Sequence, residues 1–330
     1  MTDTRRRFRI PTEEAPSYID KQGTFPTSHS SPRRSASAGQ NDTLLYAFTI
    51  IILIVGLILG YYHMPSASPP GLNKVIFNPR LYSRIQSIWF AEVPTGASIP
   101  GEASMKKWFF NPNADEKAAF DETCTANFKH ALEEVGPKRL RLPPFTNFTV
   151  ERQIARNLAS PLMSEIDTSS GELSTETAAS NALSLILLLD QLSRNIYRSD
   201  QALIYTHYDR LSQAIIHHIL ASQPRLDLVP KYRNFPVYRN WFYMPLMHSE
   251  HIEDHVLAKS LVTSMKEDIA KVGDTVAVEH VENQLNFEKR HVDIIEQFGR
   301  YPYRNKVLGR ETTEEEKKWI EEGGDHFGTA

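Results

Sequence analysis

The chain has 330 residues, of which 41% are hydrophobic and 23% charged, and its formal net charge is −3. This length can hold one large domain or two small ones. Because no basic surplus is visible downstream of residue 80, the composition argues against a partner made of nucleic acid. A single cysteine, Cys124, excludes an intrachain disulfide and any metal site built from several cysteines. Its helical surroundings predict a buried structural thiol.

The first 77 residues differ from the rest of the chain. Residues 1–43 are rich in Ser, Thr, Pro and Arg, so they should be disordered. Residues 44–62, LLYAFTIIILIVGLILGYY, contain no charge and predict a single transmembrane helix, because they would rise about 28 Å against a hydrocarbon core of about 30 Å. A cleaved signal peptide and a buried soluble helix are the alternatives. Residues 63–77 predict a Pro- and Ser-rich linker.

The orientation of this membrane segment is less clear from the sequence. The arginines of the tail slightly favour an N-terminus in the cytosol, which would place the globular part across the membrane. The organelle cannot be read from the residues. Asn147 begins the sequon Asn147-Phe148-Thr149 and is a glycosylation acceptor if that part is lumenal.

Residues 78–325 predict an all-α domain, because apolar residues recur at three- and four-residue spacing. No segment shows the sustained alternation of apolar and polar residues that is typical of a β-strand. The clusters Ile88-Trp89-Phe90 and Trp108-Phe109-Phe110 should anchor its core. Short connections favour antiparallel helix pairs, stacked as a solenoid or wrapped as a bundle. The expected caps are Asn113 and a capping box of Thr313 with Glu316, and Asp274 should begin the last long helix. The main helices are expected over 115–134, 151–166, 200–221 and 274–298. A further long helix should follow His248-Ser249-Glu250 and end at about residue 272.

The most distinctive stretch is SLILLLDQLSRNIYR, residues 184–198. Its first half is almost wholly apolar, which predicts a buried central helix, capped by Thr175. Its polar end carries Asp190, Arg194 and Arg198, which at about 100° per residue fall in an arc of roughly 80°. Because buried charges need partners, this end should meet charged groups from elsewhere in the chain.

Two explanations compete for the polar residues near this helix and in the last third of the chain. One is a buried network, since the planar fork of arginine satisfies carboxylates and helix carbonyls together. The other is a concave pocket whose guanidinium groups receive a carboxylate or phosphate. Asp254, Asp293 or Glu296 could balance the arginines. The candidate ligand-binding residues are Asp190, Arg194, Asn195, Arg198, Arg300, Arg304, Asn305 and Arg310.

Histidines suggest a second site. His248, His251 and His255 would fall within roughly 60° on one helical face, with a further histidine on the next helix. With Glu250 or Asp254 they could bind a metal ion that supports hydrolysis. The spacing is not the HExxH arrangement, however, and a polar face with one buried histidine is the plainer interpretation. We expect no metal and no cofactor, and no phosphate-binding glycine loop is present. The candidate catalytic residues are His248, Glu250 and His291.

Three stretches resemble the signature blocks of the domain of unknown function 924 family: LSLILLLDQLSRNIYR, FYMPLMHSEHIEDH and FGRYPYRNKVLGR. Together with the Trp89-Phe90 and Trp108-Phe109 pairs, the resemblance covers roughly residues 80–325. It implies a tetratricopeptide-like helical domain and no established reaction. The chain resembles a fungal-type member to which the tail and membrane segment have been added, and His251 and His255 depart from the pattern of the family.

Two functions remain as hypotheses. The preferred one is a membrane-tethered binding or scaffold domain, with a peptide or small anion held near Arg194, Arg300 and Arg304. It is preferred because the sequence contains no complete catalytic set. The alternative is a hydrolase, with or without a metal, that uses the histidine site described above.

Overall fold

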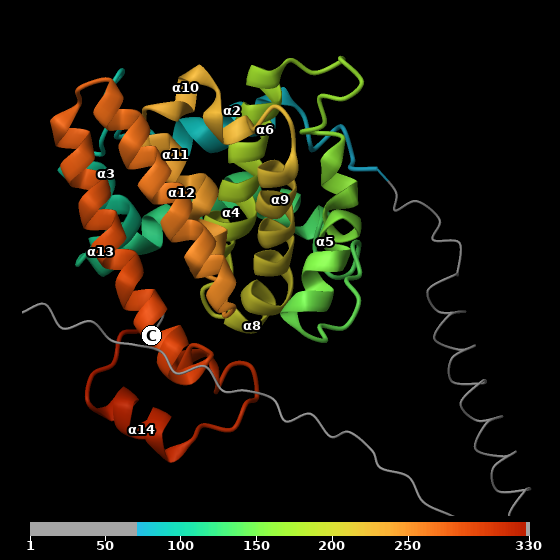
Figure 1. Cartoon of the computed structure of the whole chain (residues 1–330). Coiled ribbons are helices and arrows are strands. Elements are labelled where there is room, and N and C mark those ends of the chain that lie inside the picture. Colours follow the sequence, from blue (N-terminus) through green and yellow to red (C-terminus); the bar gives the residue numbers. More distant parts are fainter. Residues whose placement is uncertain (1–70, 328–330) are drawn as a thin grey trace, which may run out of the picture. The chain divides into compact units, whose positions relative to one another are not determined.

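The structure is a computed structural model, in which residues 71–327 are described (Figure 1). All regular secondary structure in this range is helical, which confirms the all-α class. The predicted disordered tail, the predicted transmembrane helix over 44–62 and the linker up to residue 70 lie outside the described residues. Among residues 71–327, no helix is both long and apolar enough to cross a membrane.

Several helix ends follow directly from local sequence. Asn78, Asn113 and Asn147 each cap a helix by accepting hydrogen bonds from amides of its first turn. Thr313 forms the predicted capping box with Glu316.

In chain order the elements are α2 (Pro79–Trp89), α3 (Glu102–Met105), η1 (Lys106–Phe110), α4 (Ala114–Glu134), α5 (Phe148–Met163), α6 (Thr175–Ile186), η2 (Leu187–Leu192), α7 (Ser193–Ile196), α8 (Gln201–Leu203), η3 (Ile204–Tyr208), α9 (Asp209–Ala221), η4 (Leu226–Leu228), α10 (Pro230–Arg233), α11 (Pro236–Met247), α12 (Ile252–Lys271), α13 (Thr275–Phe298), η5 (Pro302–Arg304) and α14 (Glu314–Glu321). Of these, η1, η2 and η3 are π-helical turns, and η4 and η5 are 3-10 turns.

The predicted central helix is a continuous rod made of α6, η2 and α7. Every apolar residue over 182–192 is fully buried, because α2, α4, α9 and α11 all pack against the rod. Its N-cap is Ser174, whose side chain accepts a hydrogen bond from the amide of Thr177. The predicted cap, Thr175, is already the first helical residue, so that prediction was wrong by one position. The rod ends at Ile196, and Arg198 therefore lies beyond the helix.

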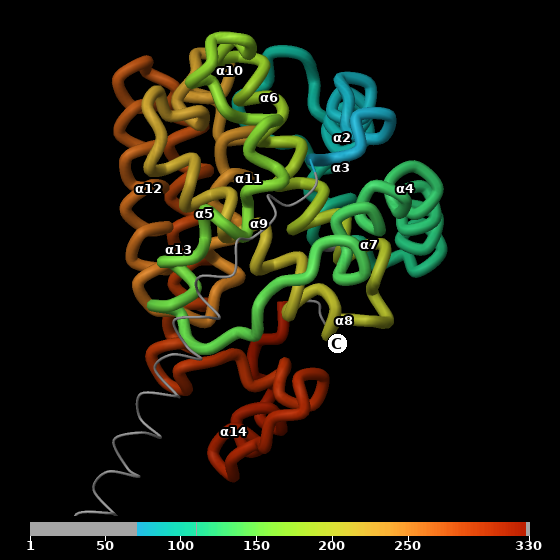
Figure 2. Tube along the Cα trace, turned by 90° about the vertical axis from the view of Figure 1, so that its right-hand side faces the viewer, coloured from blue at the N-terminus to red at the C-terminus, as the bar shows by residue number. Residues whose placement is uncertain are grey.

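Helices α12 and α13 form a hairpin that packs against α11 (Figures 1 and 2). Asp274 lies at the start of α13, as predicted, and caps it by accepting a hydrogen bond from the amide of Ala277. The helix ends at Gly299, whose φ of 67° lies in the left-handed region that favours glycine. The hairpin places the end of α13 beside the last elements of the chain.

The residues after α13 form a small C-terminal region with its own apolar cluster. Ile294, Ile295 and Tyr301 are its buried members, and Trp319 of α14 packs against them. Figure 1 shows α14 in red below the other helices, and Figure 2 shows the same arrangement from the side. This region brings the third signature stretch toward the other two.

Candidate functional site

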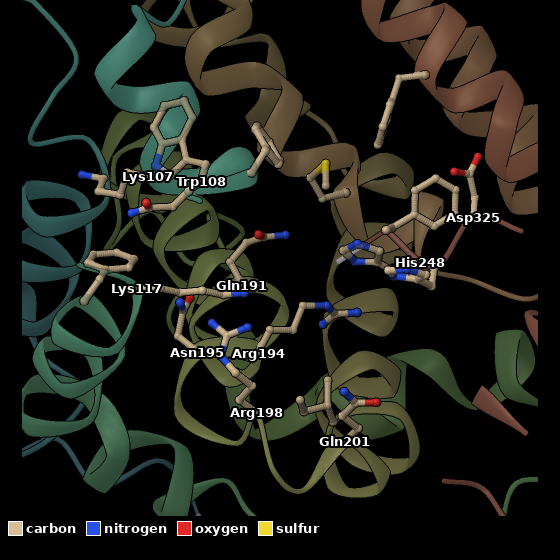
Figure 3. A pocket seen from close by; sticks show the side chains of 18 of the residues that line it. Lys107, Trp108, Lys117, Gln191, Arg194, Asn195, Arg198, Gln201, His248 and Asp325 are labelled. Atoms are coloured by element: carbon tan, nitrogen blue, oxygen red, sulfur yellow. The ribbon is translucent and has the colours of Figure 1, made fainter. Parts of the chain in front are cut away.

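A cleft of about 840 Å³ opens between the N-terminal helices, the polar end of the rod and the C-terminal region (Figure 3). Seven lysines and arginines line it, against three carboxylates, so its lining is basic. Lys107 and Trp108 lie on one side of the view, His248 and Asp325 on the other, and Arg194 between them. The predicted site residues found in the lining are Arg194, Asn195, Arg198, His248, His291 and Arg304.

The π-helical turns all contribute to this cleft. Lys107 and Trp108 come from η1, Gln191 from η2 and Tyr205 from η3. A π-turn inserts an extra residue into a helix, so it redirects the side chains that follow, and such turns are frequent at functional sites. Leucines continue on both sides of Asp190 and Gln191 within η2, so the sequence carried no signal for this π-turn.

Asp190 lies fully buried behind the cleft and orients His248. Its Oδ1 accepts a hydrogen bond from Nδ1 of His248 at 2.9 Å, and its Oδ2 accepts one from Gln191 at 2.6 Å. Burial alone would raise the pKa of Asp190, but His248 and Arg194 outweigh burial and lower it. The carboxylate is therefore ionised and holds the proton of the imidazole on Nδ1. Nε2 of His248 is the ring nitrogen left for a ligand.

The arginines at the polar end of the rod are paired by carboxylates that the sequence analysis did not consider. Arg194 makes two hydrogen bonds to Asp209, of 2.7 and 3.0 Å. Arg198 makes two to Asp121, of 2.7 and 2.9 Å, and Asn195 donates a third to the same carboxylate at 2.7 Å. These bidentate pairs hold the two guanidinium groups in place along the cleft.

Arg304 is buried in the wall of the cleft, and no carboxylate of residues 71–327 lies at ion-pair distance from it. It is 5% exposed, and its guanidinium lies 4.4 Å from the ring centre of Tyr205 and 4.5 Å from that of Tyr301. Nη1 donates to the carbonyl of His248 at 3.0 Å, whereas the buried Nε has no hydrogen-bond partner in the described part of the chain. Burial alone would lower the pKa of Arg304, but Tyr303, Glu250 and Asp209 outweigh burial and raise it, so the guanidinium is charged. An anion in the cleft would supply the missing partner.

The other predicted arginines lie outside the cleft and hold the C-terminal region in place. Arg310 makes hydrogen bonds of 2.6 and 2.9 Å to Glu250, just before α12. Arg300 donates to Glu316 of α14 at 2.7 Å, and Asn305 donates to the same carboxylate at 3.1 Å. For these residues the buried-network explanation describes the geometry, and we call the Glu250–Arg310 pair the clamp.

The histidines expected on one helical face do not share one. His248 ends α11, His251 is the N-cap of α12 and only His255 lies within a helix, so the chain turns between them. His255 is fully buried and contacts Glu288 at 2.8 Å. In the part of the chain that the structure describes, no group of three or more His, Cys, Asp or Glu residues is placed to hold a metal ion.

The candidate catalytic residues are only partly brought together. His248 and His291 both line the cleft, but Glu250 does not, because its carboxylate is held by the clamp. Burial lowers the pKa of His291 to about 3, so its imidazole is neutral at pH 7. Of the three, His248 combines a fixed orientation with a place in the cleft.

Two single residues of the sequence analysis keep ordinary structural positions. Cys124 is fully buried, and burial raises the pKa of its thiol to about 12, as expected of a structural thiol. Asn147 is exposed, and its Oδ1 accepts a hydrogen bond from the amide of Val150 at 2.9 Å. Its role as a glycosylation acceptor stays a prediction.

The aromatic clusters divide between the core and the cleft. Trp89 is 2% exposed and stacks on Trp108, with ring centres 6.0 Å apart. Phe109, which was expected in the core, is 41% exposed and lines the cleft instead. The π-turn that carries it directs its ring outward, so the core prediction was wrong for this residue.

The residues that the sequence analysis missed are chiefly carboxylates on ordinary amphipathic helices. Asp121 and Asp209 carry no local signal, because only packing brings them to the polar end of the rod. Glu316 was predicted to cap α14, and its pairing with Arg300 could not be read from that motif. The sequence analysis suggested three other carboxylates as partners of the arginines. Asp254 instead pairs with Arg152, Asp293 pairs with Lys289, and Glu296 is exposed.

The fold and the cleft define an all-α domain with a basic cleft between its helices. Residues 85–324 match the family described as "Bacterial protein of unknown function (DUF924)", and the chain belongs to this family. Among solved structures, a protein of unknown function from Agrobacterium tumefaciens is similar, with 26% identity over 76% of this chain and 100% of that chain, and a TM-score of 0.41. No curated protein matches the chain.

Proposed function

We propose that the domain binds a small anionic ligand, a carboxylate or a phosphate, in the cleft. The observation that carries this proposal is Arg304, a buried guanidinium in the cleft wall with no carboxylate at ion-pair distance among residues 71–327. Neighbouring groups that include Glu250 and Asp209 raise its pKa and keep it charged, and an anion in the cleft would give it a direct ionic partner. Its stacking between Tyr205 and Tyr301 fixes it before the ligand arrives, which lowers the ordering cost of binding.

The other basic residues of the cleft would assist in different ways. Arg194 and Arg198 already pair with Asp209 and Asp121. They would therefore contribute positive electrostatic potential, and N–H groups not used in these pairs, rather than an unpaired charge. Lys117 is exposed and makes no ion pair within residues 71–327. A volume of about 840 Å³ suits a small molecule, and we therefore favour a small anion over a peptide.

Calorimetric titration of the full-length protein in detergent with inorganic phosphate and with acetate tests this proposal. Arg304→Gln should weaken binding about 10- to 100-fold, because a hydrogen bond to a charged group contributes roughly 1.5–3 kcal/mol. Arg304→Lys, which keeps the charge, should lose less. The matched control is Arg310→Gln in the clamp, which should lower the free energy of unfolding and leave affinity unchanged. Equal loss in both glutamine variants, or no binding by the wild type, would reject the proposal.

The hydrogen bond between Asp190 and His248 favours a second function, hydrolysis of an ester of the bound anion. Nε2 of His248 would take a proton from a water molecule as its oxygen bonds to the phosphorus or carbonyl carbon. The same proton would then pass to the leaving oxygen as its bond breaks. Asp190 would stabilise the imidazolium that forms in between.

Hydrolysis of p-nitrophenyl phosphate and p-nitrophenyl acetate tests this second function. His248→Gln should reduce turnover about 100-fold or more if the imidazole transfers the proton. Asp190→Asn should also reduce turnover, because it removes the carboxylate that orients the imidazole and stabilises the imidazolium. Activity unchanged in His248→Gln, or absent from the wild type, would leave binding as the function.

We also propose that residues 44–62 attach the domain to a membrane as a single span, and that the helix pairs stack in a tetratricopeptide-like manner. The span rests on 19 uncharged residues in sequence, and the stacking on the packing of α12 with α13 and α5 with α9. Deleting 44–62 should release the protein from membranes washed with carbonate. A shift in mass on endoglycosidase treatment, lost in Asn147→Gln, would place the domain in the lumen. Release of the full-length chain by carbonate would contradict the span.

A further inference from the structure

We infer that the ligand of the cleft is an anion attached to a flat aromatic ring, and this inference rests on the proposed anion site. The argument begins with the side of the cleft opposite His248, where Figure 3 shows Lys107 and Trp108. Trp108, Phe109 and Phe120 line this side, and we call them the aromatic wall. The cleft therefore joins a basic part to an aromatic part within one continuous space.

The aromatic wall is rigid before any ligand binds. The indole nitrogen of Trp108 donates to the carbonyl of Trp89 at 3.0 Å, and the two rings stack with an angle of 16°. Trp241 meets Trp108 edge to face, with ring centres 4.9 Å apart. A ring fixed on two sides offers a flat surface at little cost in side-chain entropy.

Phe109 extends this surface toward the opening of the cleft. Its ring lies parallel to that of Trp241, with centres 5.7 Å apart and an angle of 7°, yet 41% of the residue is exposed. Exposed aromatic surface beside a basic cleft is typical of a ligand site that buries an apolar group. A flat ring fits such a surface better than a branched aliphatic group, because stacking needs a parallel face.

Lys107 gives the aromatic wall a polar edge. Its Nζ donates to the carbonyl of Ile88 at 3.0 Å and lies 5.6 Å from the ring centre of Phe120. Gln191, between the aromatic wall and Arg194 in Figure 3, has its amide nitrogen bound to Asp190. Within residues 71–327 its side-chain oxygen makes no hydrogen bond, and it could accept one from the ligand. These groups suit a ring that carries a hydroxyl, an amine or a ring nitrogen.

Titrations of the full-length protein with methyl phosphate, cyclohexyl phosphate and 1-naphthyl phosphate test the inference. Naphthyl phosphate should bind about tenfold or more tightly than methyl phosphate and also more tightly than the cyclohexyl ester. Naphthoate and cyclohexane carboxylate extend the comparison to carboxylates and show which anion the basic part prefers. Quenching of tryptophan fluorescence should accompany only the aromatic ligands.

The variant Phe109→Ala separates this inference from the proposed anion site. It should remove most of the advantage of the naphthyl ester and leave methyl phosphate affinity unchanged, whereas Arg304→Gln should weaken all three esters alike. Phe109→Leu, which keeps apolar volume without a flat face, should behave like the alanine variant. Equal affinity for the three esters in the wild type overturns the aromatic preference and leaves the anion site standing. Binding of none of them overturns both.

Discussion

At the scale of single residues, the position of the nearest carboxylate decides what each arginine does. Arg310 has Glu250 at 2.6 Å and belongs to the clamp. Arg304 is more deeply buried, yet it has three aromatic rings and a carbonyl around it and no carboxylate within ion-pair distance among the described residues. The two side chains are equivalent in sequence, both lying in the third signature stretch. Only their surroundings separate a structural role from a proposed binding role.

His291 should make the protein sensitive to acid. Burial lowers its pKa to about 3, whereas an unfolded histidine has a pKa of about 6.5. Between these values the unfolded state binds a proton that the folded state does not, so stability is lost as the pH falls below about 6.5. From pH 7 to pH 4.5 we expect His291 to account for a loss of about 1–3 kcal/mol.

Urea unfolding at both pH values measures this effect by comparing the wild type with His291→Gln. The variant should lose less stability on acidification, since glutamine does not titrate. Burial also lowers the pKa of His207 and His280. Acidification should therefore still lower the free energy of unfolding of the variant, by the part that these two histidines contribute in both proteins. Identical pH dependence in the two proteins would show that His291 is not held neutral.

At the scale of elements, the π-turns and the C-terminal segment shape the cleft. The π-turns place Trp108, Gln191 and Tyr205 in one lining although they lie on three separate elements. The segment 323–327 forms part of the opposite wall, where Phe327 stacks on His291 with ring centres 3.7 Å apart. Arg290 pairs with Asp325 of the same segment.

Gly324 allows the C-terminal segment to pass close to the indole ring of Trp319. A Cβ at this position would clash with the indole ring of Trp319, so Gly324→Ala must displace either the ring or the segment. Overpacking of this kind costs about 1–3 kcal/mol. We expect lower stability in urea and faster proteolysis near the C-terminus.

Gly101→Ala is the matched control for this substitution. Its Cβ would meet nothing within 4 Å and its backbone is extended, so stability should change by less than about 0.5 kcal/mol. Similar losses in both variants would argue against a specific contact between Gly324 and Trp319.

At the scale of the whole domain, two hydrogen-bonded links join the three signature stretches. Asp190 of the first binds the side chain of His248 in the second, and the carbonyl of His248 accepts from Arg304 of the third. The clamp adds a further link between the second and third stretches. The polar end of the rod is thus assembled from segments more than 100 residues apart in sequence.

The clamp should couple the C-terminal region to the rest of the domain. Glu250 and Arg310 are mostly buried, so removing either partner leaves an unpaired charge, and each of Glu250→Gln and Arg310→Gln should cost about 2 kcal/mol. The double variant should cost less than the sum, with a coupling of about 1 kcal/mol. A double-mutant cycle in urea measures this coupling energy. Additive losses would show that the interaction between Glu250 and Arg310 does not stabilise the fold.

The sequence by itself determined the all-α class, the buried rod and most helix ends. These features depend on local spacing: the apolar run over 183–189, Asn113, Asp274 and the capping box of Thr313 each act within a few residues. The same locality led to the wrong expectation for His248, His251 and His255, because the helix break between them is set by how the chain turns between α11 and α12.

Only the tertiary structure decided which charged groups meet. The pairing of Arg194 with Asp209 and of Arg198 with Asp121 depends on how α9 and α4 pack against the rod, and the exposure of Phe109 depends on a π-turn. An ion pair forms between groups a few ångströms apart in space, whatever their separation along the chain. Local patterns therefore identified the polar residues, and packing left Arg304 without a carboxylate at ion-pair distance among the described residues.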